Sequence, residues 1–294
     1  MAKKTRKKIY LRCSSLGNLF VEGRGAVFTE NDANRISELE FERDNLVNRN
    51  GRKVSWTDNK QEELDKLIAK RDAKPELSQT AKSEVEKLWL MNEKGYYNDL
   101  HNKYLTKGLL NEQEGLELVS LVEDNSYFKN KERREVLLYK DKDVEIWLTG
   151  EPDYVDEKAK RIKDIKCSWD AKTFMNSELS NLYEIQLQGY AILFDAETLE
   201  LHYCLTDADD NLLSQEIWKC RNRYGIIDPD DEKFKPMLEQ IKRNLVYSDN
   251  PAYTLEERVK TYSISRDKDF KKKLTEKAKL VAEYYKTIKL NKLN

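Results

Sequence analysis

Two short acidic motifs follow each other closely in the second half of the chain. Gly150-Glu151-Pro152-Asp153 comes first and Asp164-Ile165-Lys166 follows. Both are predicted to lie on or beside neighbouring β-strands, and residues i and i+2 of a strand point to the same face. Asp164 and Lys166 would therefore meet one substrate together, and Asp153 could reach the same place. Two carboxylates and a lysine in this arrangement can bind a hard divalent metal ion and assist hydrolysis of a phosphodiester.

The D-x-K spacing has little weight by itself, because 36% of the residues are charged and the same spacing recurs elsewhere in the chain. The surroundings of Asp164-Ile165-Lys166 are different, since Ile162 and Cys167 make it part of an apolar strand. A buried charge is costly unless it is paired or bound to a metal ion. The motif is therefore a candidate functional site, and a purely structural ion pair is the alternative.

Glu112 is a third candidate ligand for the metal ion. A helix is predicted over residues 106–122, and the side chains that share the face of Glu112 are apolar: Leu109, Leu116 and Val119. A carboxylate on this core-facing stripe would lie near the acidic strand ends. The alternative is a helix rotated so that Glu112 reaches only the surface.

Gln186 repeats this pattern on a helix predicted over residues 179–194. Its face is otherwise apolar or aromatic, and Tyr190 lies one turn away. A glutamine in this place could orient Lys166 or hold a phosphate. The alternative is an amide whose hydrogen bonds are satisfied within the core.

Composition limits the metals and the compartment that we expect. The chain has 294 residues and 39% hydrophobic content, without an apolar run long enough to span a membrane. Four cysteines lack C-x-x-C spacing: Cys13, Cys167, Cys204 and Cys220. This favours reduced thiols in a cytoplasm. His101 and His202 are far apart, which disfavours a zinc site, so Mg²⁺ or Mn²⁺ is expected.

Charge is balanced overall but uneven along the chain. The net charge is −1, from 53 basic and 54 acidic residues. Residues 251–294 hold 12 Lys or Arg against 6 Asp or Glu, and residues 1–12 are basic without any acidic residue. Two basic ends could line a path for DNA, and solvated helix faces are the alternative.

The order of the predicted elements indicates the fold class. Residues 9–28 read as a short strand or turn and then a helix, with Ser14 and Ser15 as N-caps. Charged helices are predicted over residues 30–104, with a hairpin loop at Asn48–Gly51. Strands are predicted over 135–139, 143–148, 161–167 and 199–206, and further helices over 211–223, 231–246 and 268–289. This order predicts an α/β (α+β) core with a central mixed sheet flanked by helices.

Five motifs, in order, resemble those of a known family. They are Arg12-Cys13-Ser14-Ser15-Leu16-Gly17-Asn18 with Gly23-Arg24-Gly25, Lys107-Gly108-Leu109-Leu110-Asn111-Glu112, Thr149-Gly150-Glu151-Pro152-Asp153, Asp164-Ile165-Lys166-Cys167-Ser168 and Gln186-Leu187-Gln188-Gly189-Tyr190. The chain resembles the phage recombination exonucleases of the lambda-exonuclease type, a RecB-like and YqaJ-like group of the PD-(D/E)XK superfamily. The motifs leave residues 30–100 and 251–294 poorly covered.

The resemblance implies a restriction-endonuclease-like core and a Mg²⁺-dependent deoxyribonuclease. It implies 5′-to-3′ exonuclease digestion of linear duplex DNA in phage recombination or replication. It also implies a ring-shaped homo-oligomer, a single-strand annealing protein as partner, and the host cytoplasm as location if the protein is phage-encoded. The cysteine spacings do not match those of related nucleases that hold an iron–sulfur cluster, so none is expected.

The resemblance also implies roles at the metal site. The implied metal ligands are Glu112, Asp153, Asp164 and the backbone carbonyl of Ile165. Lys166 would position or deprotonate the attacking water and offset charge on the scissile phosphate.

Further residues would hold the lysine and the DNA. Gln186 and Tyr190 would order Lys166 and the DNA backbone. Arg24, with Ser14 or Ser15, would bind a phosphate group of the DNA. One departure from the family is Glu151, whose charge would repel an incoming 5′ phosphate.

The domain organisation follows from the same resemblance. We expect one nuclease domain over residues 1–294, with a charged helical insertion at 30–104, a catalytic core at 105–250 and a basic C-terminal helical segment at 251–294. Alternative functions are an endonuclease or nickase on the same core, a catalytically inactive DNA-binding protein, or a charged helical scaffold. Cleavage of closed circular DNA would separate an endonuclease from an exonuclease.

Overall fold

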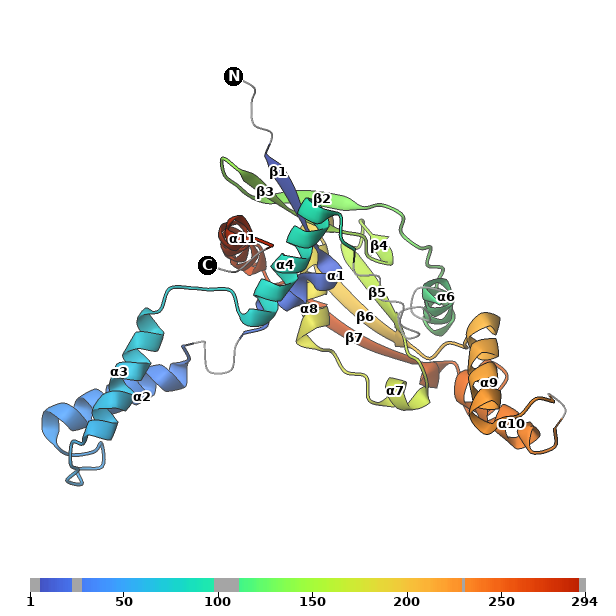
Figure 1. The fold of residues 1–294 in the computed structure, drawn as a ribbon, viewed down its shortest axis with the longest axis horizontal. Coiled ribbons are helices and arrows are strands. Elements are labelled where there is room, and N and C mark those ends of the chain that lie inside the picture. Colours follow the sequence, from blue (N-terminus) through green and yellow to red (C-terminus); the bar gives the residue numbers. More distant parts are fainter. Residues whose placement is uncertain (1–5, 23–27, 98–110, 229–230, 291–294) are drawn as a thin grey trace, which may run out of the picture. The chain divides into compact units, whose positions relative to one another are not determined.

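The computed structural model describes residues 6–22, 28–97, 111–228 and 231–290 (Figure 1). The chain separates into two compact units. The first consists of Met1–Gly17 and Leu90–Ala278, and the second of Asn18–Trp89 and Lys279–Asn294. Among the described residues, no helix is both long and apolar enough to cross a membrane.

The first unit contains a mixed sheet of three strands in the order β1, β3, β2. The strands are β1 (Lys7–Arg12), β2 (Arg134–Lys140) and β3 (Val144–Gly150). β3 is central, since it pairs in parallel with β1 and antiparallel with β2. Its alternate residues Val144, Ile146 and Leu148 are buried, so one face of the strand faces the core.

A second mixed sheet has four strands in the order β4, β5, β6, β7. The strands are β4 (Tyr154–Asp156), β5 (Arg161–Cys167), β6 (Thr198–Cys204) and β7 (Val259–Ser265). β5 and β6 are parallel, whereas both outer pairs are antiparallel. Parallel strands need a long connection, and a helix provides it between β5 and β6.

Helices cover both faces of β5 in the first unit (Figure 1). The described helices of this unit are α1 (Cys13–Leu16), α6 (Glu112–Val122), α7 (Ala171–Met175), α8 (Asn181–Phe194), α9 (Asp210–Tyr224), α10 (Phe234–Leu245) and the 3-10 turn η2 (Glu256–Arg258). On one face, Ile165 packs with Leu116 and Val119 of α6. On the other, Asp164 contacts Gln186 of α8. Successive residues of β5 therefore point to opposite faces of the strand, toward α6 and toward α8 in turn.

The second unit contains a helical hairpin with a small core of its own. Its helices are α2 (Glu30–Asn45) and α3 (Asp58–Asp72). A capping box starts α2, because Thr29 accepts a hydrogen bond from the backbone of Asp32 and Asp32 accepts one in return. The buried residues Ile36, Leu39 and Leu64 join the two helices. The predicted loop at Asn48–Gly51 connects them.

Three further elements contain the boundaries between the units: the 3-10 helix η1 (Gly17–Phe20), α4 (Gln79–Lys94) and α11 (Phe270–Thr287).

The structure confirms the mixed α/β class and corrects several details. Ser14 and Ser15 are not N-caps, since Arg12 holds that position without a side-chain cap bond. The strands form two mixed sheets instead of one. Residues 251–294 are not helical throughout, because β7 lies among them. β1 and β7 lie outside residues 105–250 but complete the two sheets. The single nuclease domain and its helical insertion stay predictions.

Candidate active site

A tight connection between the two sheets brings the two acidic motifs together. β3 ends at Gly150, and β4 begins at Tyr154 and runs antiparallel to β5, where Tyr154 pairs with Lys163. This register sets Asp153 beside the middle of β5. Its Oδ2 accepts a hydrogen bond of 2.7 Å from the backbone N–H of Ile165. The backbone of the D-x-K strand therefore fixes the orientation of the Asp153 carboxylate.

Asp164 and Lys166 point from β5 toward α8, as their i, i+2 spacing predicts. Lys166 forms an ion pair with Oδ2 of Asp164. The Nζ atom of Lys166 also lies 5.2 Å from the ring centroid of Tyr183 on α8. Asp164 is buried, and Oδ2 has no hydrogen bond besides this ion pair. The lysine and the carboxylate thus form one unit on this face of β5.

Gln186 joins the predicted residues of α8 to Asp164. Its amide Nε2 donates a hydrogen bond of 3.1 Å to Oδ1 of Asp164 and one of 3.0 Å to the hydroxyl of Tyr190. Both Gln186 and Tyr190 are buried. Gln188, two residues away, bonds instead to the backbone of Ser265 and Asp267. The two glutamines of α8 therefore have separate surroundings.

The carboxylates of the two aspartates, Asp153 and Asp164, repel each other. Burial and the nearby charge of Asp164 raise the pKa of Asp153 to about 7. Burial opposes the charge of Lys166, but the Asp164 carboxylate outweighs it and raises the pKa of Lys166 above its ordinary value. Burial, followed by the charge of Asp164, also raises the pKa of Tyr190. The positive charge of Lys166 does not cancel the repulsion between the carboxylates of Asp153 and Asp164. A bound cation would relieve this repulsion.

Two glycines permit the close packing beneath these side chains. A Cβ atom on Gly150 would lie 2.7 Å from the Sγ of Cys13 and 2.8 Å from the ring of Tyr190. A Cβ atom on Gly189 would lie 2.9 Å from the same sulfur. Neither position has room for a larger residue. The glycines of the motifs at 149–153 and 186–190 thus let α1, α8 and the end of β3 meet.

A cleft of about 300 Å³ opens over the site, and most of the predicted site residues line it. Those that line it are Ser14, Glu112, Asp153, Asp164, Lys166, Gln186 and Tyr190. Glu112 lies at the start of α6, partly exposed, and forms an ion pair with Lys129. Its carboxylate reaches the same cleft as the two aspartates. Its surroundings are thus the cleft wall and a lysine, instead of the apolar core.

Some predicted site residues lie elsewhere. The hydroxyl of Ser15 donates a hydrogen bond of 3.4 Å to the backbone oxygen of Arg12, and Ser15 does not line the cleft. Arg24 lies outside the described residues. The Ile165 side chain packs on the opposite face of β5, and a metal-binding role of its carbonyl stays a prediction.

Sequence reasoning missed three residues of the cleft, two of them basic. Lys129, Asn130 and Arg133 come from the segment that precedes β2, and all three line the cleft. Arg133 Nη2 lies 3.3 Å from Oε2 of Glu151. This ion pair offsets the charge that was expected to repel a 5′ phosphate. The basic run Lys129–Arg134, placed directly before a strand, was the available signal.

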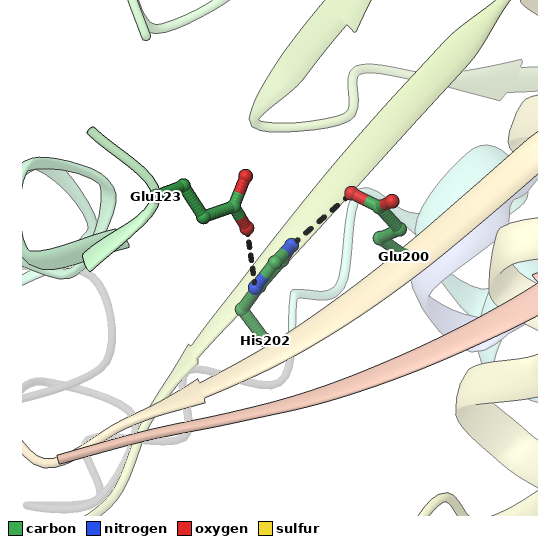
Figure 2. Close-up of side chains that lie close together, drawn as sticks. All are labelled: Glu123, Glu200 and His202. Atoms are coloured by element: carbon green, nitrogen blue, oxygen red, sulfur yellow. Dashed lines mark ion pairs between the residues drawn. The ribbon is translucent and has the colours of Figure 1, made fainter. Parts of the chain in front are cut away.

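Another acidic cluster lies on the opposite face of β5. Figure 2 shows Glu123 and Glu200 on either side of His202. Their ligand atoms lie within 4.8 Å of one another, as metal binding requires. However, the fully buried Lys163 places its Nζ 2.8 Å from Glu123 Oε2, 2.7 Å from Glu200 Oε2 and 3.4 Å from His202 Nε2. The lysine ammonium thus already serves as the cation of this cluster.

The fold is similar to those of solved exonucleases. A phage-related exonuclease from Haemophilus somnus 129PT has a TM-score of 0.54 and 23% identity, over 94% of this chain and 93% of that one. The alkaline exonuclease LHK-Exo from Laribacter hongkongensis has a TM-score of 0.42 and 11% identity, over 70% and 78% of the two chains. LHK-Exo in complex with dAMP has a TM-score of 0.38 and 13% identity, over the same shares. No family model matches the sequence, and no curated protein matches it either.

The likeness to the Haemophilus protein covers nearly the whole of both chains, and at this level of identity it is evidence about the fold. It agrees with the restriction-endonuclease-like core that the five motifs predicted. The chain therefore has the mixed α/β fold of a phage-related exonuclease, and the predicted resemblance is confirmed at the level of the fold.

Proposed function

We propose that the protein is a metal-dependent deoxyribonuclease. One observation carries this proposal: two mutually repelling aspartates, the half-buried Asp153 and the buried Asp164, line a cleft with Lys166 paired to Asp164. A carboxylate whose pKa is strongly raised, such as that of Asp153, is typical of catalytic sites when it lies in a cleft. Their residue types suit phosphodiester hydrolysis, and the phage-related exonuclease of similar fold supports the same reaction.

The residues of the cleft fit a hard divalent cation. The candidate donors are all oxygen atoms, from Glu112, Asp153, Asp164 and the carbonyl of Ile165, which favours Mg²⁺ or Mn²⁺. The raised pKa of Asp153 supports this assignment, because a cation would stabilise its charged form. When bound, the ion supplies Lewis-acid activation of a phosphoryl oxygen.

The remaining residues orient the reactants. Lys166 carries a positive charge in this geometry, since its pKa is raised, and it can offset the charge of a scissile phosphate or hold the attacking water. Gln186 fixes one oxygen of Asp164 and the hydroxyl of Tyr190. Tyr190 remains protonated near neutral pH, so it can donate a hydrogen bond.

We further propose the finer activity that the family resemblance implies. The substrate is linear duplex DNA, digested from the 5′ end as an exonuclease in phage recombination. Ser14, Lys129 and Arg133 line the cleft and can contact the terminal phosphate. The remaining parts of this proposal are a ring-shaped homo-oligomer, a single-strand annealing partner and a reducing cytoplasm, for which the four free cysteines are suited.

Linear duplex DNA labelled at either end tests the activity. With Mg²⁺ we expect release of label from the 5′ end first, and no release with EDTA. A 5′ phosphate should accelerate digestion, and Arg133→Ala should reduce this advantage, with Arg134→Ala as a neighbouring control outside the cleft. Rapid cutting of closed circular duplex would contradict the exonuclease assignment. Absence of any metal-dependent cleavage would contradict the nuclease assignment.

A further inference from the structure

A second cavity lies beyond the carboxyl ends of β5 and β6. Its volume is about 430 Å³, which is within the range of small-ligand sites. Trp169 reaches it directly after β5, and α9 and α10 follow β6 and form its walls. In open α/β sheets, ligands commonly bind outside the carboxyl ends of the strands. The cavity shares no lining residue with the cleft of the candidate active site.

The floor of this cavity is apolar. Trp169 is buried there and packs with Ala208, Leu212 and Leu245. The backbone N–H of Ala208 donates a hydrogen bond of 2.7 Å to the carbonyl of Leu245, which ties the end of α10 to the segment after β6. The floor is therefore firmly held.

The rim offers groups that suit a nucleotide. Tyr224 is 59% exposed, so its ring is available for stacking. Arg223 has no ion-pair partner among the residues that the structure describes, and the amides of Gln240 and Asn244 also line the rim. An aromatic ring, amides and a guanidinium group together can stack a base, bond to its edge and hold its phosphate.

The two carboxylates of the rim are already engaged. Asp170 caps α7 by accepting a hydrogen bond of 2.7 Å from the backbone N–H of Thr173. Glu216 forms an ion pair of 2.9 Å with Lys219. The positive charge of Arg223 is thus left to attract an anionic ligand.

The cavity begins just beyond the strand that carries the D-x-K motif. Trp169 follows Lys166 by three residues, so their Cα atoms are at most about 11 Å apart along an extended chain. This distance corresponds to about three stacked nucleotides of one DNA strand. One DNA strand could therefore contact both places.

We propose that this cavity binds an unpaired base of the DNA strand a few nucleotides from the scissile phosphate. The proposal rests on the nuclease function proposed above and adds a second contact to its substrate site. The base must be unpaired, because its face stacks on Tyr224 while its edge bonds to the amides. The bound strand is therefore single-stranded beyond the cleft.

Binding of two oligonucleotides tests the proposal without any cleavage. Fluorescence anisotropy in EDTA would compare a twelve-nucleotide thymidine strand with an abasic strand of the same length and charge. The parent protein should bind the thymidine strand more tightly. Tyr224→Ala should weaken thymidine binding about tenfold and the abasic strand hardly at all, because only bases stack. Arg223→Ala should weaken both strands.

Two matched variants separate this cavity from general charge and surface effects. Trp218→Ala removes another exposed aromatic residue of α9, and Arg243→Ala removes an arginine of the neighbouring α10. Neither residue lines the cavity. Both should bind like the parent. Equal thymidine binding by the parent and Tyr224→Ala, or equal losses in the control variants, would overturn the proposal. A parent that binds thymidine in this way but never cleaves DNA would instead contradict the proposed nuclease function.

Discussion

Two clusters of buried charge lie on opposite faces of one strand. Lys163 and Asp164 are consecutive in β5, so their side chains point to opposite layers. Lys163 faces Glu123, Glu200 and His202, and the ring of Tyr127 lies 4.5 Å from its Nζ. Asp164 faces the cleft with Asp153 and Lys166. Both clusters contain acidic residues and one lysine, but their charges are balanced differently.

The pKa shifts of the carboxylates show this difference. Burial raises the pKa of Glu200, but hydrogen bonds with His202 and Lys163 outweigh it and lower the pKa to about 2. The pKa of Glu123 is also lowered, because burial, which raises it, is outweighed by the hydrogen bonds with Lys163 and Tyr127 together with nearby positive charge. The pKa of Asp153, in contrast, is raised to about 7. The Lys163 cluster is therefore electrostatically satisfied, whereas the cleft is not.

Ligand spacing alone would place a metal site at the Lys163 cluster. The three residues around Lys163 have metal-like distances, but an ion there would have to displace a buried ammonium. In the cleft, a cation would meet carboxylates that repel each other. The balance of charge therefore favours the cleft as the proposed metal site, and the following experiments test this distinction.

The largest expected effect is the loss of cleavage in Asp153→Asn. An asparagine oxygen can still accept the hydrogen bond from Ile165, so the fold should persist, but the proposed metal-binding carboxylate is lost. We expect kcat to fall at least about a thousandfold, or about 4 kcal/mol in activation free energy. The rise in Tm that Mg²⁺ gives the parent should disappear. Single-turnover cleavage and thermal denaturation measure the two effects.

Glu200→Gln is the matched control from the other face of β5. It also neutralises one buried carboxylate in a cluster that contains a lysine. Its kcat should stay within about threefold of the parent, and Mg²⁺ should still raise its Tm. A large loss of cleavage in Glu200→Gln with activity retained in Asp153→Asn would reverse the assignment of the two clusters.

The next effect concerns stability, in Lys163→Met. Removing the ammonium leaves Glu123 and Glu200 without their buried partner, which should cost about 3–5 kcal/mol in the free energy of unfolding. Urea denaturation in EDTA measures this loss. The double variant Lys163→Met/Glu200→Gln should recover part of it, since one of the unpaired charges is removed. A Lys163→Met protein as stable as the parent would contradict the role of Lys163 as the cation of this cluster.

Much of the core could be predicted from the sequence, because local patterns determine it. The third predicted strand, residues 161–167, agrees with β5 at both ends. Its apolar residues around Asp164 distinguished it from the other D-x-K segments. α8 was similarly clear, since Asn181–Phe194 is largely apolar and Ser180 caps it.

The missed features depend on contacts between distant segments. β7 lies in a lysine-rich region, and it becomes a strand through its pairing with β6. Lys163 and Glu200 are neighbours in the parallel register of β5 and β6, which no local pattern reveals. The ion pair between Arg133 and Glu151 likewise joins two segments, one before β2 and one after β3. Contacts between segments far apart in the sequence therefore determine these features, and local sequence patterns cannot predict them.

A smaller effect should appear in the pH dependence of stability without metal. The pKa of Asp153 is raised in the folded protein, so the folded state keeps this proton while the unfolded chain loses it. The stability that the group contributes is present below about pH 3.8 and is lost as the pH rises through 7. The full shift in the pKa of Asp153 amounts to at most about 4 kcal/mol.

Variants isolate this contribution from that of other groups. In EDTA, Asp153→Asn should gain stability relative to the parent as the pH rises from 5 to 8. Glu200→Gln should instead be less stable than the parent by a constant amount over pH 5 to 8. The pKa of Glu200 is lowered, so the stability that it contributes is present throughout this range and is lost only as the pH falls toward 2. Urea midpoints across this range measure both. Parallel curves for the parent and Asp153→Asn would contradict the raised pKa.

The smallest expected effect separates two buried glutamines on one helix. Gln186 bonds to Asp164 and Tyr190, whereas Gln188 bonds to the backbone of Ser265 and Asp267. Gln186→Ala leaves the buried Asp164 and Tyr190 without this partner, and Gln188→Ala leaves the backbone groups of Ser265 and Asp267 without theirs. Each change should cost about 1–3 kcal/mol in stability. Only Gln186→Ala should also lower kcat, by about tenfold or about 1.4 kcal/mol, because it frees the Asp164 carboxylate to reorient. Comparing kcat and urea midpoints of the two variants distinguishes positioning from packing. If both lose stability equally and neither loses turnover, Gln186 serves only the core of this face, like Gln188.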